Sequence, residues 1–391
     1  MMINNKETDK QYVANTYARF DLEITRGRGS LVYDGDGNEY IDLSSGIATN
    51  TFGLCDDEWI SAVSEQISKF QHTSNLYYSE PSSRLAEMLC KRTGAKKVFF
   101  SNSGAEANEC AIKVARKWAR DNKGEGYHNI ITLKNSFHGR TVTTLAATGQ
   151  DTFHTIFDPF TEGFLYAEAN NSSALCSLVK NNKCCAIMFE LVQGEGGVMA
   201  LDGEFVNTTA SLAKEENLLI IVDEVQTGNG RTGTLYAYEQ YGISPDVVTT
   251  AKGLAGGLPI GATMFFEKTE NTLTPGTHGS TFGGNPVSCA AAISVISRID
   301  EALLDDVKRK SEFIVSALNG APGIKSVSGL GLMLGIETER DAGEVIKECM
   351  AHGVLPIKAK HKVRLLPALN IPMDLLVRAV DVIKRAAAGK V

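Results

Sequence analysis

The sequence predicts an α/β protein with a large domain built on a mostly parallel sheet, followed by a smaller α+β domain. Between residues 97 and 266, short apolar or β-branched runs alternate with longer segments of helical spacing, a pattern typical of strands connected by helices. Residues 218–222 read LLIIV without polar alternation, as expected of a strand that is covered on both faces. We therefore expect this strand near the centre of the sheet.

The first fifty residues contain a hairpin signal, in which the run DGDG at 34–37 separates two short apolar segments, 31–33 and 40–43. Such a hairpin is too small to fold alone. We expect residues 1–50 to form an N-terminal segment that packs on the C-terminal domain.

Residues 51–288 are expected to form the large domain. Helical spacing is clear at Trp59, Val63 and Ile67 and again along the alanines of 111–119. The expected strands are residues 97–101, 130–133, 186–190, 218–223, 246–250 and 262–266. Pro286 fits the first turn of a helix that runs to about residue 297 and leads into the small domain, residues 289–391. There, 331–337 and 363–366 are the strand candidates.

Charge and composition exclude several classes of function. The 391 residues carry 39 Lys and Arg against 46 Asp and Glu, a net charge of −7 that disfavours nucleic acid as a partner. The first ten residues are polar, and glycine and proline interrupt the longest charge-free run, 271–297, so we expect no membrane span and a cytoplasmic protein. The eight cysteines show no CxxC pair and no zinc-like spacing with histidine, which predicts reduced, mostly buried thiols and no metal.

Three motifs follow expected strands and carry candidate chemistry. Residues 101–108 read SNSGAEAN after the first of these strands, and a helix that begins there offers backbone amides to a phosphate, although the same residues also cap ordinary helices. Asp223 ends the central strand, where ligands of parallel sheets bind. Lys252 directly follows the next strand, where burial lowers a lysine pKa and makes its amine nucleophilic.

Together these three motifs match the anchors of a pyridoxal phosphate site. The lysine binds the cofactor as a Schiff base, a carboxylate keeps its pyridine nitrogen protonated, and the helix amides hold its phosphate. The combination is far more specific than any of its parts.

The chain resembles the class III, fold-type-I aminotransferases from about residue 16 to 367. The resemblance rests on six motifs: SNSGAEAN at 101–108, FHGRT at 137–141, ELVQGEGG at 190–197, DEVQTG at 223–228, AKG at 251–253 and HGSTFGGNP at 278–286. Residues 74–78, SNLYY, also match. The family usually has GHxHP where this chain has GLCDD at 53–57, and EPVQ where it has ELVQ at 190–193, but neither departure removes a catalytic group.

The resemblance implies a role for each matching residue. Lys252 is implied as the Schiff-base lysine and proton carrier, Asp223 as the partner of the ring nitrogen, and Gln226 as the partner of the phenolic oxygen. Ser103, Gly104 and Ala105 are implied to hold the phosphate, and Phe137 to stack on the ring. Thr281 is implied to reach the phosphate in the partner subunit of a homodimer with shared active sites.

The substrate residues implied by the resemblance are Arg140, Arg364, Glu195 and Ser280. A guanidinium pairs bidentately with a carboxylate, so Arg140 would take the α-carboxylate of the donor and Arg364 that of 2-oxoglutarate. Glu195 would neutralise Arg364 while the ω-amino donor is bound. Read without the resemblance, Arg364 is a strand arginine paired with any surface acid.

Within the family, the chain is most similar to enzymes of arginine biosynthesis that move the δ-amino group of N-acetylornithine to 2-oxoglutarate. Ornithine, succinylornithine, succinyldiaminopimelate and 4-aminobutyrate stay open as donors, because few residues distinguish their distal groups. An aminomutase or an inactive cofactor-binding protein is the remaining alternative.

Overall fold

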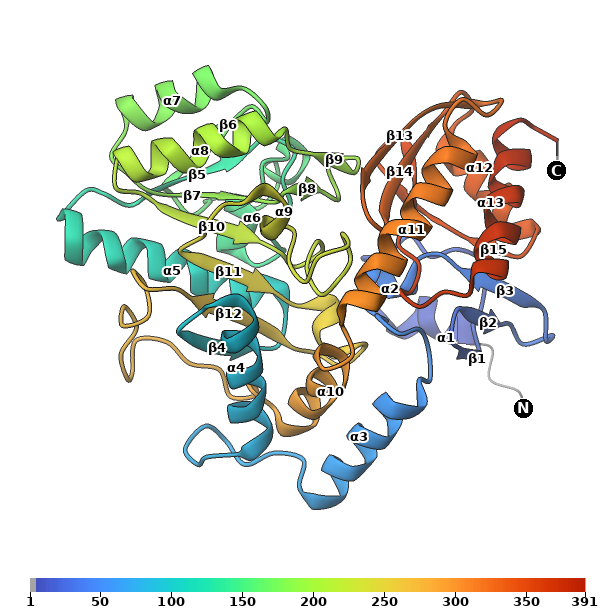
Figure 1. Cartoon of the computed structure of the whole chain (residues 1–391), viewed down its shortest axis with the longest axis horizontal. Coiled ribbons are helices and arrows are strands. Elements are labelled where there is room, and N and C mark those ends of the chain that lie inside the picture. Colours follow the sequence, from blue (N-terminus) through green and yellow to red (C-terminus); the bar gives the residue numbers. More distant parts are fainter. Residues whose placement is uncertain (1–4, 391) are drawn as a thin grey trace.

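The computed structural model describes residues 5–390, and its secondary structure forms two bodies (Figure 1). The larger body contains a seven-stranded sheet with helices on both faces, and the smaller one contains the C-terminal helices and sheet together with the N-terminal strands. The expected α/β architecture is confirmed.

The large sheet has the strand order β4-β12-β11-β10-β7-β5-β6. Its strands are β4 (Lys97–Ser101), β5 (Asn129–Leu133), β6 (Phe164–Ala167), β7 (Cys184–Phe189), β10 (Leu219–Asp223), β11 (Val247–Thr250) and β12 (Gly261–Phe265). All neighbours are parallel except β12, which runs antiparallel to both β11 and β4. Strand β10 stands in the middle and is buried along its whole length, as its apolar run predicts.

Helices α3 (Asp57–Lys69), α4 (Glu80–Thr93), α5 (Gly104–Lys123), α6 (Val142–Ala147), α7 (Ser172–Asn181), α8 (Gly203–Glu215), α9 (Tyr238–Tyr241) and α10 (Pro286–Ile296) belong to the large body. Helix α10 begins at the predicted proline. The side chain of Asn285 caps it by accepting from the amides of Val287 and Ser288.

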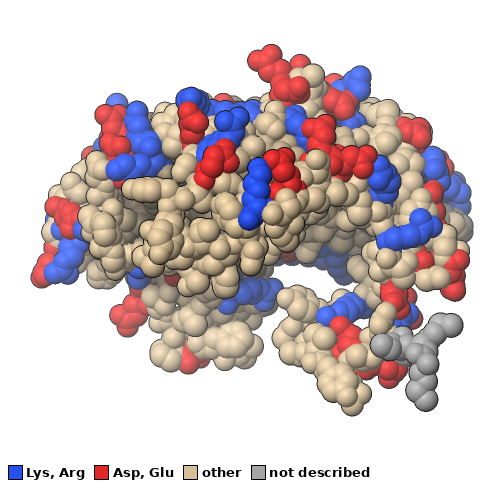
Figure 2. Space-filling model, turned by 90° about the horizontal axis from the view of Figure 1, so that it is seen from below, with Lys and Arg blue, Asp and Glu red and all other residues tan. Residues whose placement is uncertain are grey.

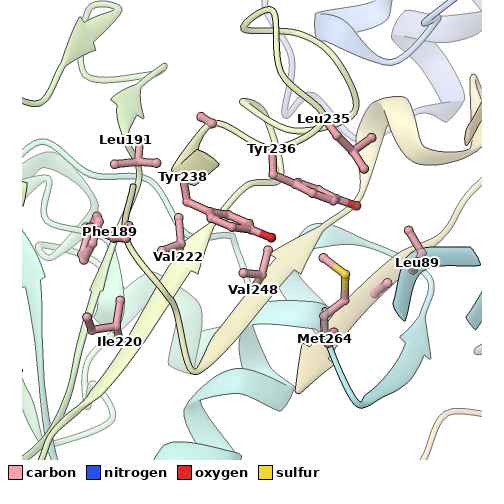
Figure 3. Close-up of a cluster of buried hydrophobic side chains, with 14 of the residues drawn as sticks. Leu89, Phe189, Leu191, Ile220, Val222, Leu235, Tyr236, Tyr238, Val248 and Met264 are labelled. Carbon is pink, nitrogen blue, oxygen red and sulfur yellow. The ribbon is translucent and has the colours of Figure 1, made fainter. Parts of the chain in front are cut away.

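One apolar cluster supports the sheet beneath the carboxyl end of β10 (Figure 3). Phe189, Val222 and Val248 project from three adjacent strands into this cluster. The rings of Tyr236 and Tyr238 stack over them with centroids 6.1 Å apart. This packing immobilises the strand end that carries Asp223.

The small body has its own sheet, in the order β13-β14-β17-β16, and all of its strand pairs are antiparallel. Its elements are α11 (Glu301–Leu318), β13 (Ile324–Leu330), β14 (Met333–Thr338), α12 (Ala342–Ala351), β16 (Ile357–Ala359), β17 (Lys362–Leu365) and α13 (Met373–Ala387). Strands β14 and β17 are the two that the sequence predicts. A second apolar cluster lies between this sheet and the three helices.

The N-terminal hairpin is present and joins the small body. Elements α1 (Asn5–Tyr12), β1 (Arg26–Arg28), β2 (Leu31–Tyr33), β3 (Glu39–Asp42) and α2 (Ser45–Ala48) occupy this region. Strand β3 pairs in parallel with β15 (Val354–Leu355), so segments more than 300 residues apart share a sheet. The domain boundaries after residues 50 and 288 stay a prediction.

Three surface and composition features complete the fold. No helix among residues 5–390 is long and apolar enough to cross a membrane. The eight cysteines are free thiols, of which five are buried: Cys110, Cys184, Cys185, Cys289 and Cys349. Acidic and basic side chains are interspersed over the face that Figure 2 shows, with no large area of a single charge.

Candidate active site

A cavity of about 400 Å³ opens where the carboxyl ends of β10 and β11 meet the first turn of α5. Eight of the residues singled out from the sequence line it: Ser103, Gly104, Ala105, Phe137, Arg140, Asp223, Gln226 and Lys252. Their positions span 150 residues of sequence, and the sheet topology brings them together.

Lys252 begins the short 3-10 helix η2 (Lys252–Ala255), separated from the end of β11 by one residue, with φ at +44°. That left-handed conformation is costly for a residue with a side chain, so the surrounding structure must hold it. Within residues 5–390 the Lys252 amine has neither a hydrogen-bond nor an ion-pair partner. Burial lowers the pKa of Lys252, and the negative charge of Glu195 only partly offsets this effect. The arrangement favours a neutral, nucleophilic amine.

Asp223 is almost fully buried and is held by three groups. Its Oδ2 accepts a hydrogen bond of 2.7 Å from Asn108 Nδ2 and lies 2.8 Å from His138 Nδ1. Its Oδ1 accepts from the backbone amide of Val225 at 3.0 Å. These contacts to both oxygens fix the orientation of the Asp223 carboxyl group at the cavity wall.

Asn108 and His138 were assigned no role from the sequence, although both lie inside recognised motifs. Asn108 is on the buried face of α5, one turn beyond Gly104, and its Oδ1 accepts from Thr249 Oγ1 at 2.7 Å. The periodicity of α5 therefore indicates that position 108 faces inward, but the contact with Asp223, 115 residues away, is set by the tertiary fold.

The first turn of α5 forms one end of the cavity. Ser103 is the N-cap, and its hydroxyl accepts from the amide of Glu106 at 3.2 Å. At position 104 a Cβ would lie 2.6 Å from Val225 Cγ1, so glycine lets the helix start directly against the loop after β10. The free amides of this turn and the positive end of the helix dipole suit an anion.

Phe137 and Arg140 also line the cavity. The Arg140 guanidinium lies 4.3 Å from the centroid of the Phe153 ring and 5.4 Å from that of Phe137. No acid in the described part of the chain pairs with Arg140, and the side chain is exposed, so it is available to a carboxylate of a ligand. The backbone amide of Phe137 donates to Glu190, and burial raises the pKa of that carboxyl well above its usual value.

Arg364 and Glu195 form an ion pair that joins the two bodies. Arg364 lies on β17, and Glu195 lies in the turn between β8 (Val192–Gln193) and β9 (Met199–Ala200). Nη1 of Arg364 donates to Glu195 Oε1 at 2.7 Å and to Gln226 Oε1 at 3.3 Å. Burial disfavours the charged form of Glu195, but the Arg364 charge outweighs that effect and lowers the pKa of Glu195. Gln226 thus connects the ion pair to the cavity wall.

Ser280 and Thr281 do not line this cavity. They lie on a second hollow of about 790 Å³, together with Asn75, Leu76 and His278. The side chain of Asn75 donates to the carbonyl of Ser280 at 3.1 Å, and Asn102 donates to its hydroxyl at 3.1 Å. In a single chain, therefore, neither residue reaches the cavity that holds Lys252.

The residues of the cavity fit pyridoxal phosphate. An unpaired lysine amine, a fixed carboxylate and a helix N-terminus are the donor set that this cofactor requires, and here all three face one cavity of suitable size. Phe137 adds an aromatic surface on the cavity wall. No residue of the set is diverted to another partner that would prevent it from holding the cofactor.

Comparison with known proteins gives the same result. The family model for class-III aminotransferases matches residues 12–387. The chain is 51% identical to the acetylornithine aminotransferase of Haemophilus ducreyi, with 97% of each chain covered.

Solved structures agree. The ornithine aminotransferase of Toxoplasma gondii, described with partial occupancy of PLP at its active site, matches with a TM-score of 0.94 at 32% identity. The match covers 98% of this chain and 94% of the T. gondii chain. The N-acetylornithine aminotransferase of Stenotrophomonas maltophilia matches with a TM-score of 0.84 at 33% identity and 98% of each chain. The chain belongs to the class-III aminotransferase family.

Proposed function

We propose that this pyridoxal-phosphate-dependent aminotransferase moves the δ-amino group of N2-acetyl-L-ornithine to 2-oxoglutarate, giving N-acetyl-L-glutamate 5-semialdehyde and L-glutamate in arginine biosynthesis. The observation that carries this proposal is the 2.7 Å ion pair between Arg364 and Glu195 beside the cavity. An arginine that is already neutralised tolerates a donor with no carboxylate at that point. When 2-oxoglutarate enters, its carboxylate replaces Glu195.

The shared cavity supports a cofactor role for each of these side chains. Bound pyridoxal phosphate supplies an electron-accepting ring that stabilises negative charge on the neighbouring substrate carbon. Lys252 would hold the cofactor covalently, Asp223 would keep the ring nitrogen protonated, and Gln226 would donate to the phenolic oxygen. Ser103, Gly104 and Ala105 would hold the phosphate, and Phe137 would contact the ring face.

With cofactor and substrate bound, the Lys252 amine would act as the acid and base of the reaction. Its Nζ accepts the proton from the substrate carbon that carries the amino group and later returns it. The lowered pKa of Lys252 suits this work, since a neutral amine can accept a proton. Arg140 binds the α-carboxylate of the donor and fixes the distance from that group to the reacting carbon.

A homodimer with shared sites is part of the proposal. Leu76 is 86% exposed, Tyr77 71% and Phe282 59%, and a second copy would cover these apolar side chains, which flank Ser280 and Thr281. Thr281 would then reach the phosphate, and Ser280 the substrate, of the partner's cavity. We also propose a cytoplasmic location, which the eight free thiols support.

Donor preference tests the proposed substrate. Free ornithine carries an α-ammonium that N-acetylornithine lacks, and a cation left buried without a partner costs several kcal/mol. We expect kcat/KM for N-acetylornithine to exceed that for ornithine by at least about tenfold, or roughly 1.4 kcal/mol. Steady-state rates with saturating 2-oxoglutarate measure this ratio.

Equal or reversed values would reassign the chain as an ornithine aminotransferase, the activity that the T. gondii neighbour is named for. The higher identity to an acetylornithine enzyme, 51% against 32%, favours the acylated donor. The same assay with succinylornithine, succinyldiaminopimelate and 4-aminobutyrate tests the other donors. Turnover of any donor without 2-oxoglutarate would indicate an aminomutase.

A further inference from the structure

Arg231 is a buried cation outside the cavity for which the site roles give no use. Its exposed fraction is 3%, and no acid among residues 5–390 pairs with it. Burial lowers the pKa of Arg231 to about 9. Burying a charge without a counter-charge is costly, so its hydrogen bonds must fulfil a purpose that an apolar side chain could not.

Those hydrogen bonds cross from the large body to the small one. Nη1 of Arg231 donates to the carbonyl of Leu332 at 3.1 Å and to that of Pro367 at 2.5 Å. The amide of Leu332 in turn donates to the carbonyl of Arg231 at 2.9 Å. Residue 331 must be glycine here, because its φ is +54° and a Cβ would lie 2.5 Å from the backbone of Thr232.

The two carbonyls stand at facing ends of adjacent strands. Leu334 of β14 pairs with Leu365 of β17, and Leu332 and Pro367 lie two residues beyond that pair on each strand. Arg231 therefore ties together the ends of β14 and β17. The next pair in the register, Gly335 with Arg364, carries the guanidinium that meets Glu195.

The loop that carries Arg231 also carries Gln226, which accepts from Arg364 Nη1 at 3.3 Å. The chain from Asp223 to Arg231 thus begins at the cavity wall and ends on the strand pair that bears Arg364. The length of this segment and its attachment to β14 and β17 set the distance between the cavity wall and Arg364.

We propose that Arg231 is a positioning residue that holds Arg364 at a fixed distance from the cofactor cavity and so determines how well the α-carboxylate of 2-oxoglutarate or glutamate binds. This role rests on the proposed function of Arg364. Binding of the N-acetylornithine carboxylate depends instead on Arg140, which belongs to the large body and does not contact Arg231 or the ends of β14 and β17.

The test compares Michaelis constants in purified holoenzyme. In Arg231→Met we expect KM for 2-oxoglutarate to rise by at least about tenfold, since a displacement of about 1 Å has such effects, while KM for N-acetylornithine changes by less than about threefold. Arg231→Lys, which keeps a cation able to reach one carbonyl, should give an intermediate rise, and it decides the question alone if the methionine variant does not fold. The absorption band of the bound cofactor should be unchanged in both. Unchanged KM for 2-oxoglutarate, or equal rises for both substrates, overturns the role.

Lys310→Met is the matched control. Lys310 is also a buried cation, but it lies in the small body. It donates to the carbonyl of Leu369 at 2.9 Å and pairs with Asp306 at 2.6 Å, and it has no hydrogen bond to the ends of β14 and β17. We expect it to lower Tm with no selective rise in KM, and a selective rise would contradict the assignment to Arg231. Arg364→Lys distinguishes failure of the proposed function from failure of the positioning role. If this variant leaves KM for 2-oxoglutarate unchanged, the proposed function of Arg364 is wrong. If KM rises in Arg364→Lys but in neither Arg231 variant, only the positioning role of Arg231 is wrong.

Discussion

Lys252→Ala is expected to lower kcat by at least about 10⁴-fold while leaving the protein folded. The substitution removes both the amine that binds the cofactor covalently and the base that takes the substrate proton. The substitution breaks no side-chain hydrogen bond or ion pair, because the amine has no such partner among the described residues. Steady-state kinetics and the absorption band of the lysine-bound cofactor measure the two losses separately.

Lys268→Ala serves as the control. Lys268 is half exposed, does not line the cavity, and forms an ion pair of 3.2 Å with Asp246. It should retain normal kcat and a normal absorption band. A Lys252→Ala enzyme with both the band and full turnover would exclude Lys252 as the cofactor lysine.

Asp223→Asn is expected to bind cofactor but to lose about 10²-fold or more in kcat. The amide fits the same space and can still accept from Asn108, so the cavity keeps its shape. It carries no negative charge, however, and therefore stabilises the protonated ring nitrogen poorly. Fluorescence or absorbance titration measures cofactor binding, and single-turnover rates measure the loss of chemistry.

Asp246→Asn is the matched control, because Asp246 precedes β11 at the opposite end of the sheet, where it accepts from the amide of Ile220 at 2.9 Å. We expect its effect on kcat to be less than about threefold. Near-normal kcat in Asp223→Asn would mean that another group faces the ring nitrogen.

The sequence predicts the elements whose signals are local. The unbroken apolar run before Asp223 identifies the central strand, and Asn285 with Pro286 identifies the start of α10. The sequence does not predict strand β6, which lies at the sheet edge, is only four residues long and is mostly half-buried, although its residues are apolar. It also does not predict β13, which is only partly buried and has polar residues between its apolar ones. Burial is what makes a strand recognisable in a sequence.

The candidate site shows a similar limit. Lys252 and Asp223 could be found because each lies at the carboxyl end of a strand, and the carboxyl ends of neighbouring parallel strands meet at one edge. Asn108 and His138 lie 85 residues or more from Asp223 in the sequence, so their contacts with it depend on side-chain orientations that the tertiary fold sets. The burial of Arg231 depends on packing between the two bodies. Spacing along a chain holds no record of such contacts.

Transfer of an isotopically labelled δ-nitrogen tests the central claim most directly. N-acetylornithine labelled at that atom is mixed with the holoenzyme and 2-oxoglutarate, and the products are analysed by mass spectrometry. We expect the label in the amino group of glutamate, in equal amount to the N-acetylglutamate semialdehyde formed, and no sustained turnover when 2-oxoglutarate is left out. Glutamate without the label, or continued turnover without the acceptor, would contradict the assignment.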